Sequence, residues 1–280
     1  MNRERIYQAL RCRLNFGPSL VKRNVLGRDV KVRFGVVPEK PDYDEAWTYY
    51  LISQSSVMFD VGCNVGWCLL LACIDNPERR IVAFDANPKA MIAAGETLFL
   101  NGYAEQVQFV LGFTSNVEKE KVDFFTVGTG SAGSKFRSVA QAASKKNSFF
   151  EVQTITLDKI AEKLGIIPDF MKMDIEGAEG EALEGAKKIG AQRKTKFLIE
   201  MHATAELSMA ANGDRILKWC RELGYDAYFL KDHKRITNSD SFAHRGRCHL
   251  FLQPAGWEYP KPLMHLQEGD GIEKVQSFLK

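Results

Sequence analysis

Short apolar runs alternate with longer amphipathic or small-residue segments along most of the chain after residue 56. A buried strand is a run of about four to eight apolar residues, whereas a helix repeats its apolar positions every three to four residues. Strands are therefore predicted at 57–60, 80–85, 107–111, 121–127, 149–156, 169–174, 196–202, 227–231 and 248–253, and helices at 67–74, 88–101, 157–164, 178–189 and 206–223. This alternation predicts an α/β fold with a mostly parallel, Rossmann-like sheet and helices on both faces. The last two strands leave no room for a crossover helix, so the last strand is expected to be antiparallel.

The first 55 residues follow a different pattern. Apolar residues at four-residue steps predict a short helix in 1–16, alternation around Gly27 predicts a β-hairpin in 24–34, and 43–53 reads as a helix. A segment of this size is too small for a core of its own, so we expect it to cap the larger domain. The predicted organisation is an extension at 1–55, a ligand-binding domain at 56–255 and a tail at 256–280, with a polar, lysine-rich mobile flap at 131–148.

Composition indicates an ordinary globular protein. The chain has 280 residues, of which 45% are hydrophobic and 26% charged, and its net charge of +3 is too small to indicate nucleic acid. The basic residues of the first 33 positions are interpreted as a solvated face. The six cysteines form no Cys-x-x-Cys pair, and no apolar run suggests a signal peptide or a membrane span. We therefore expect a cytoplasmic protein without integral membrane contact.

The most distinctive segment lies where the first strand of the larger domain ends. Asp60 closes the strand, and Gly62, Asn64 and Gly66 follow it in a turn before an apolar helix. A dinucleotide site requires G-x-G-x-x-G, in which the helix N-terminus meets a pyrophosphate, and this turn has another spacing. A cationic ligand without phosphate benefits instead from a nearby carboxylate, and S-adenosylmethionine is such a ligand. The alternative is an ordinary strand-to-helix turn.

A second acid closes the next strand. Asp85 lies 25 residues after Asp60, the separation expected for an acid that accepts the hydroxyls of a ribose. Asp85 is also a possible helix cap, but Asn87, which precedes Pro88, fits that position better and leaves Asp85 free. The predicted cofactor site consists of Asp60, Gly62, Asn64, Gly66, Asp85, Ala86, Asn87, Gly112, Phe113 and Asp174.

The densest group of charged residues runs from Lys172 to Glu179. Lys172 and Asp174 share one face of a predicted strand, and a buried strand rarely carries charges unless they pair or serve a site. Glu176 and Glu179 could both be first-turn acids of the following helix. Glu176 is assigned to the site instead, because it is expected at the mouth of the cofactor cleft. For Glu179 the two roles fit equally well.

Two further polar residues, Glu200 and His202, end the next strand on one face. A histidine beside a carboxylate can act as a general base near neutral pH. Asp174, Glu200 and His202 also offer ligands for a metal ion from adjacent strand ends, although three scattered residues are weak evidence and no metal is predicted.

Together these residues resemble the FkbM family of class I S-adenosylmethionine-dependent methyltransferases. The resemblance extends from about residue 57 to 225. It rests on 59–67, 83–88, 101–102, 156–158, 183–186, 200–202 and above all the lysine, acid, glutamate and glycine block at 172–179. Cys63 stands where the family commonly has alanine, and Asp85 to Pro88 replaces the usual Glu-Pro sequence. The resemblance implies O-methylation of a hydroxyl on a sugar, glycan or natural product.

The expected partner is a small-molecule or glycan acceptor and not a nucleic acid. Because an alcohol reacts only as its proton begins to leave, we expect His202 or Glu176 to take the proton, with Lys172 and Glu200 orienting the base or the acceptor. The alternatives are N-methylation of a peptide or amine, a nicotinamide-dependent oxidoreductase and a scaffold that binds S-adenosylmethionine without catalysis.

Overall fold

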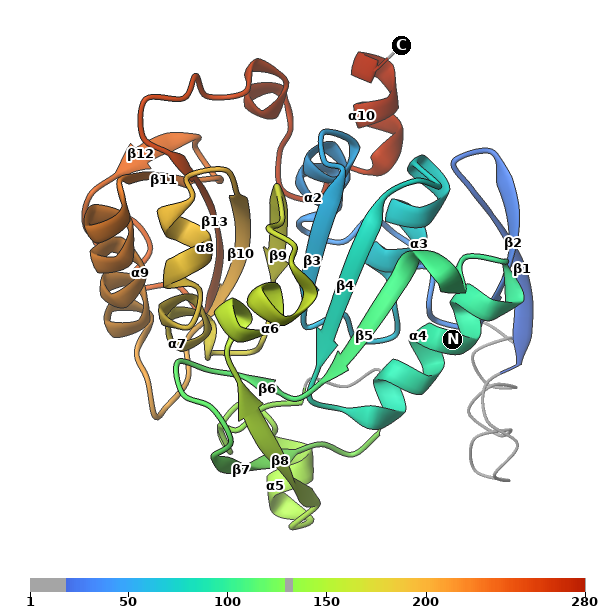
Figure 1. Cartoon of the computed structure of the whole chain (residues 1–280), viewed down its shortest axis with the longest axis horizontal. Helices are drawn as coiled ribbons and strands as arrows, with labels where there is room; N and C mark the ends of the chain where they lie inside the picture. The colour runs from blue at the N-terminus through green and yellow to red at the C-terminus, as the bar shows by residue number, and fades with distance from the viewer. Residues whose placement is uncertain (1–18, 129–132, 280) are drawn as a thin grey trace.

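An eight-stranded sheet forms the centre of the protein, in a computed structural model that describes residues 19–128 and 133–279. The strand order is β12-β11-β13-β10-β9-β3-β4-β5 (Figure 1). β13 runs antiparallel to both β10 and β11, whereas β10, β9, β3, β4 and β5 are parallel. The predicted α/β sheet with an antiparallel last strand is confirmed. The strands are β3 (Val57–Val61), β4 (Arg80–Asp85), β5 (Val107–Leu111), β9 (Phe170–Met173), β10 (Lys196–His202), β11 (Tyr225–Phe229), β12 (Lys234–Ile236) and β13 (Arg247–Pro254).

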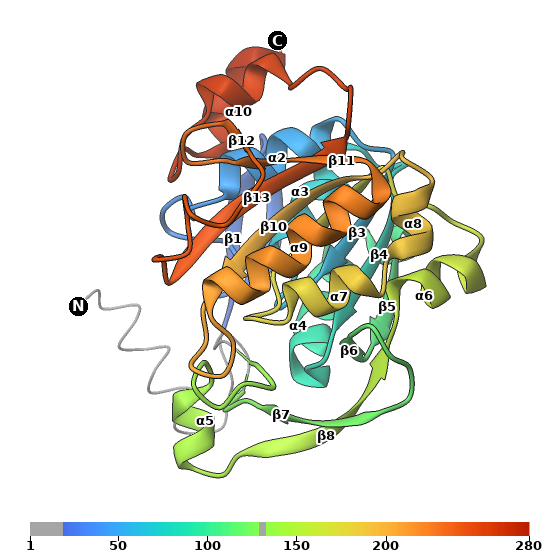
Figure 2. The same ribbon diagram turned by 90° about the vertical axis from the view of Figure 1, so that its left-hand side faces the viewer.

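Helices cover both faces of this sheet (Figures 1 and 2). One layer contains α2 (Glu45–Ser53), α3 (Trp67–Asp75) and α4 (Pro88–Leu100), and the other contains α6 (Leu157–Leu164), α7 (Glu179–Glu184), α8 (Lys187–Ala191) and α9 (Met209–Leu223). Alternate residues of the strands face the two layers, so the core has two halves. Phe59 and Phe84 are fully buried in the second half with ring centroids 5.3 Å apart, and burial of each contributes about 1.5 to 3 kcal/mol.

The single helix predicted at 178–189 is wrong, because the chain breaks into α7 and α8 at Gly185. A Cβ at Gly185 would overlap the carbonyl oxygen of Ser115, so this loop lies directly against the break. Asp158 then accepts hydrogen bonds from the backbone N–H groups of Lys188 and Ile189 at 2.8 and 2.9 Å. These contacts from distant segments stabilise a new helix start.

The N-terminal part forms the predicted hairpin, β1 (Leu20–Val25) and β2 (Arg28–Arg33). Its two-residue turn is Leu26-Gly27, with φ of 51° and 80°, and includes the glycine around which the hairpin was predicted. The side chain of Asn101 bonds the backbone of Lys31 in both directions at 2.7 and 2.8 Å and holds the hairpin against the end of α4. The helix predicted at 1–16 lies outside the described residues.

A small sheet lies beyond the carboxyl ends of the parallel strands (Figure 1). It has the order β6-β8-β7, with β6 (Phe113–Thr114), β7 (Lys121–Phe125) and β8 (Phe149–Ile155). Residues 133–148 of the predicted flap contain α5 (Gln141–Lys145) and pair with β7 through Ser134, while 129–132 lie outside the described residues. Part of the flap is thus structured by this sheet.

The C-terminal residues cover α2. They form α10 (Ile272–Leu279) and the short 3₁₀ helix η2 (Lys261–His265), and η1 (Ala104–Gln106) is the other such turn in the described residues. The indole N–H of Trp47 donates to the carbonyl of Leu266 at 3.2 Å, which ties α2 to this segment. In residues 19–128 and 133–279, no helix has the length and apolar character needed to span a membrane.

Candidate active site

The carboxyl ends of the central strands bring the predicted site residues to one edge of the sheet. A cleft with about 650 Å³ of empty space opens there. Among the residues that line it are Gly62, Asn64, Asp85, Ala86, Asn87, Gly112, Phe113, Asp174 and Glu176. Gly66, which was also predicted for the cofactor site, does not line this cleft. It directly precedes α3, and a Cβ on it would lie 2.8 Å from the Cβ of Ala94. Its role is close packing of α3 on α4.

The glycine turn requires positive φ at successive bends. Gly62 has φ of 91° and Asn64 has φ of 46°, a conformation that asparagine tolerates better than most residues. A Cβ at Gly62 would overlap the carbonyl oxygen of Asp174. The backbone of β3 therefore reaches the end of β9 without a side chain between them, and the floor of the cleft is bare backbone.

The carboxylate of Asp85 is fixed by backbone donors. Its Oδ2 accepts from the N–H of Asn64 at 2.8 Å and its Oδ1 accepts from the N–H of Asn87 at 2.7 Å. Asn87 caps α4 as predicted, since its side chain accepts from Lys89 N, so Asp85 is not the cap. Burial raises the pKa of Asp85 and the backbone donors oppose the shift. Each oxygen keeps a lone pair, so the acid can still accept from a ligand.

A second cavity, with about 620 Å³ of empty space, adjoins the cleft and shares Gly62, Asn64 and Asp174 with it. Asp60 lines this cavity and is 1% exposed. Its Oδ2 is buried and has no hydrogen-bond partner in the described part of the chain. Burial raises the pKa of Asp60 to about 6, with Lys172 opposing the shift. An unpaired buried carboxylate oxygen is costly, which favours a ligand cation or donor in this cavity.

Lys172 and Asp174 form an ion pair on the face of β9 toward α2. Lys172 Nζ donates to Asp174 Oδ2 at 3.2 Å and lies 3.6 Å from Asp44 Oδ2, at the start of α2. Burial opposes the charge of Lys172, but Asp174 and Asp44 raise its pKa above the usual range. Burial raises the pKa of Asp174 to about 7, against the pull of Lys172. Because the Asp174 side chain is 28% exposed at the junction of the two cavities, a ligand can reach it.

His202 lies among three glutamates. Its Nδ1 is 3.3 Å from Glu179 Oε1, and its Nε2 is 3.6 Å from Glu176 Oε2 and 3.5 Å from Glu200 Oε1. Burial opposes protonation, yet hydrogen bonds with Glu179 and Glu200 raise the pKa of His202 to about 11. With carboxylates beside both ring nitrogens, the protonated ring is favoured, and in that form it is a cation among the acids.

Glu179 is the residue that fixes this ring. It is fully buried and also accepts from the backbone N–H of Gly177 and from the side chain of Asn212, both at 2.8 Å. Of the two roles that the sequence left open, first-turn acid or site residue, the geometry gives Glu179 both. The Asn212 amide, which comes from α9, is a partner that the sequence reasoning missed.

Three more residues join the site from distant segments and were also missed. The register of β10 and β13 places His249 opposite Glu200 and Arg247 opposite His202. Arg247 Nη1 is 3.1 Å from Glu200 Oε1, and His249 Nε2 is 3.5 Å from Glu200 Oε2. Burial opposes the ionisation of Glu200, but His202, His249 and Lys172 hold its pKa well below the usual range. In the sequence, Arg247 and His249 could have been found because they alternate with apolar residues at the start of a strand. Asp44 has no comparable signal, since it is only one acid before a helix.

A mostly parallel sheet of this order, with acids and a bare glycine turn at its carboxyl edge, defines a class I methyltransferase fold. Residues 60–227 match the family described as the methyltransferase FkbM domain. The chain belongs to the FkbM methyltransferase family, and the resemblance found from its motifs is confirmed.

Solved structures similar to this chain include methyltransferase FkbM from Methylobacillus flagellatus KT, at 16% identity and a TM-score of 0.43. That match covers 71% of this chain but only 43% of the other, so this chain spans less than half of its length. TYW2 of M. jannaschii in complex with AdoMet matches at 12% identity, over 84% of each chain, with a TM-score of 0.44. TYW2 of P. horikoshii with MeSAdo matches at 12% identity, over 89% of this chain and 81% of the other, with a TM-score of 0.45. No curated protein sequence matches the chain.

Proposed function

We propose that this protein transfers the methyl group of S-adenosylmethionine to a hydroxyl oxygen of a small-molecule or glycan acceptor. The observation that carries the proposal is the junction of the two cavities at Gly62, Asn64 and Asp174, next to the glutamates around His202. An elongated cation fits two joined cavities lined by acids. The reacting group is then expected at the junction, where proton-accepting residues also lie.

The residues present fit the cofactor. Asp85 is rigidly held and keeps a lone pair on each oxygen for ribose hydroxyls, and Ala86, Asn87, Gly112 and Phe113 line the same end of the cleft. The unpaired Oδ2 of Asp60 offers an acceptor for an ammonium group in the second cavity. The bare backbone at Gly62 leaves room for close approach. When bound, S-adenosylmethionine supplies a methyl group attached to a sulfonium, and the rest of the cofactor becomes a neutral thioether after transfer.

Glu176 is the base in this proposal. It lines the cleft, and its side chain is 26% exposed, so an acceptor hydroxyl can reach it. Burial raises the pKa of Glu176 above the usual range, with His202 opposing the shift, which makes the carboxylate a stronger base than an exposed glutamate. Of the two bases predicted from the sequence, Glu176 is favoured because a protonated His202 has no free lone pair.

The remaining predicted catalytic residues hold charges in place. His202, positioned by Glu179, keeps a cation 3.6 Å from Glu176 and attracts an acceptor oxygen as it becomes negative. Glu200 lies 3.5 Å from the same ring nitrogen, Nε2, and Lys172 holds Asp174 at the junction. Such positioning can lower the barrier by about 7 to 11 kcal/mol when the acceptor oxygen lies in line with the methyl group.

The experiment is incubation of the purified chain with methyl-labelled S-adenosylmethionine and a fractionated cell extract. The expected result is label in a glycan or small molecule, in a linkage stable to acid as an ether is. The Asp85→Asn variant is the control, because it should bind the cofactor weakly and leave the extract unlabelled. Label in RNA, in a peptide amine or in no fraction would each overturn the acceptor proposed.

A further inference from the structure

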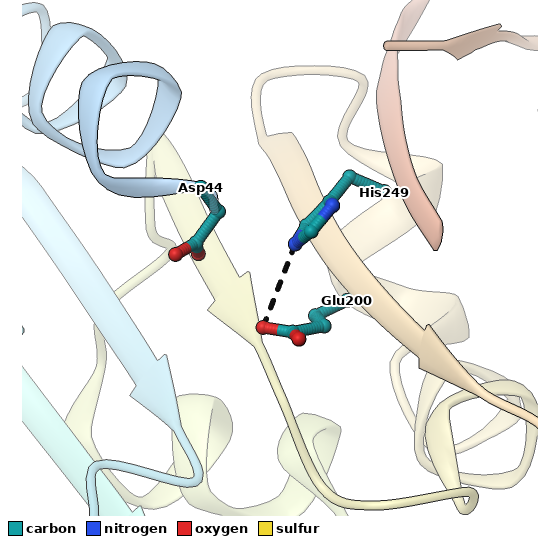
Figure 3. A group of neighbouring side chains, drawn as sticks. All are labelled: Asp44, Glu200 and His249. Atoms are coloured by element: carbon teal, nitrogen blue, oxygen red, sulfur yellow. Dashed lines mark ion pairs between the residues drawn. The ribbon is translucent and has the colours of Figure 1, made fainter. Parts of the chain in front are cut away.

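A second cluster of polar side chains lies next to the residues around His202, between α2, β10 and β13. Asp44, Glu200 and His249 are all buried there, and one ligand atom from each lies within 4.8 Å of the others. Figure 3 shows the Asp44 carboxylate and the His249 ring converging on the Glu200 carboxylate from two different elements. This trio differs from the Asp174, Glu200 and His202 group considered from the sequence, although both include Glu200.

The imidazole of His249 is the informative member. The residue is 4% exposed, and its Nε2 is buried without a hydrogen-bond partner in the described part of the chain. That atom points toward Glu200 Oε2 at 3.5 Å, too far for a good hydrogen bond (Figure 3). Trp47 packs beside the ring, with centroids 5.4 Å apart, and keeps it in place. A buried nitrogen lone pair or N–H without a partner costs free energy unless a ligand satisfies it.

The carboxylates of this trio also favour binding of a cation. Lys172 is a buried cation nearby, but its Nζ makes its hydrogen bond to Asp174 and stays 3.6 Å from Asp44 Oδ2. Arg247 and His202 occupy the other oxygen of Glu200, Oε1, and leave Oε2 toward His249. Within the trio, Asp44 has Lys172 and Glu200 Oε1 has Arg247 as a nearby cation, whereas Glu200 Oε2 has only the His249 ring beside it.

We propose that Asp44, Glu200 and His249 bind a divalent transition-metal ion. Two carboxylates with one imidazole suit Mn²⁺ or Zn²⁺ better than Mg²⁺, which prefers oxygen ligands and water. Bonds of about 2.1 Å need ligand atoms roughly 3 to 4 Å apart, so the side chains have to close by about 1 Å. Lys172 can keep its bond to Asp174 while Asp44 turns to the metal. The site adjoins that of the proposed function, because Asp44 also lines the second cavity and Glu200 also contacts His202.

The test uses the full chain, dialysed against a chelator and titrated with Mn²⁺ in the absence of S-adenosylmethionine. Free Mn²⁺ is followed by electron paramagnetic resonance. The expected result is saturable binding of about one ion per chain, displaced by Zn²⁺, with a higher melting temperature in the presence of metal. Absence of saturable binding up to about 1 mM Mn²⁺ and Zn²⁺ would overturn the proposal whatever the variants do.

Four variants identify the ligands. His249→Gln and Asp44→Asn should each weaken Mn²⁺ binding by at least about tenfold and remove the metal-induced rise in melting temperature. His265→Gln carries the same change at an exposed histidine and should bind as the wild type does. His202→Gln should weaken binding less than His249→Gln does, because His202 contacts the Glu200 oxygen that is turned away from His249. Loss of binding in His202→Gln with retention in His249→Gln would place the metal in the other trio. If His249→Gln does not fold, Asp44→Asn and the wild-type titration decide. Since no methyl donor is present, this result is independent of the proposed reaction.

Discussion

Glu176→Gln is the most direct test of the proposed chemistry. Glutamine keeps the shape of the side chain but cannot accept the proton of an acceptor hydroxyl. The backbone of residue 176 has φ of 55°, and Ser134 Oγ donates to its carbonyl at 2.9 Å, a contact that the substitution leaves intact. Removal of a general base costs roughly 10² to 10⁴ in rate, equal to about 3 to 5 kcal/mol of activation free energy. Affinity for S-adenosylmethionine should change little, because the cofactor contacts lie elsewhere in the cleft.

The pH dependence of the rate gives a second readout. Burial is the largest cause of the raised pKa of Glu176, followed by the opposing pull of His202 and the repulsion of Glu179 and Glu200. A base is active when deprotonated, so the single-turnover rate should rise with pH through this raised pKa and then level off. The rising limb should disappear in Glu176→Gln.

Single-turnover kinetics with the acceptor found by labelling, and calorimetry for the cofactor, provide the assay. Glu258→Gln is a matched control, since that side chain is 78% exposed and pairs only weakly with Lys261. A rate for Glu176→Gln within a few-fold of wild type would refute the assignment. If Asp174→Asn removes the rising limb instead, the base is Asp174, whose pKa of about 7 also suits the role.

Three further substitutions test the site around this base. Gly62→Ala should abolish cofactor binding and lower the melting temperature, because the new Cβ overlaps the Asp174 carbonyl; calorimetry showing normal binding would contradict that geometry. Lys172→Met should destabilise the fold by about 3 kcal/mol in denaturant unfolding at pH 8. The loss should be smaller at pH 6, because Asp174, with a pKa of about 7, is then mostly protonated and has no ion pair to lose. Equal losses at both pH values would argue against the ion pair. NMR should find His202 still protonated at pH 8. The free energy of unfolding should fall as pH rises from about 6.5 towards 11, and this pH dependence should be absent in His202→Gln. A ring that titrates near 6.5 would exclude its role as a fixed cation.

The parts of the site that the sequence predicts are those set by local chain order. Asp60, Asp85 and Asp174 each close an apolar strand, and parallel strands necessarily bring their carboxyl ends to one edge. The glycine turn was equally readable, because its positive φ values restrict the residue types allowed there. Period-two alternation also put Lys172 and Asp174 on one face.

The parts that the sequence does not predict depend on contacts between distant segments. The helix break at Gly185 follows from the Ser115 loop lying against it, and no local signal announces that contact. Glu179 was ambiguous because one residue serves both a helix start and the His202 ring. Asp44 enters the site only because α2 packs over β9, which apolar periodicity alone does not fix.

The direction of β13 decides which residues complete the catalytic edge. A parallel neighbour of β10 would bring its carboxyl end beside Glu200 and His202. Because β13 is antiparallel, its first residues stand there instead, with Arg247 opposite His202 and His249 opposite Glu200. The site therefore gains an arginine and a histidine from a strand start, 45 residues or more after β10 ends. In the proposed function the glycine turn and Asp85 hold the cofactor whatever the acceptor is, and two of the three proposed metal ligands, Asp44 and His249, come from the start of α2 and the start of β13.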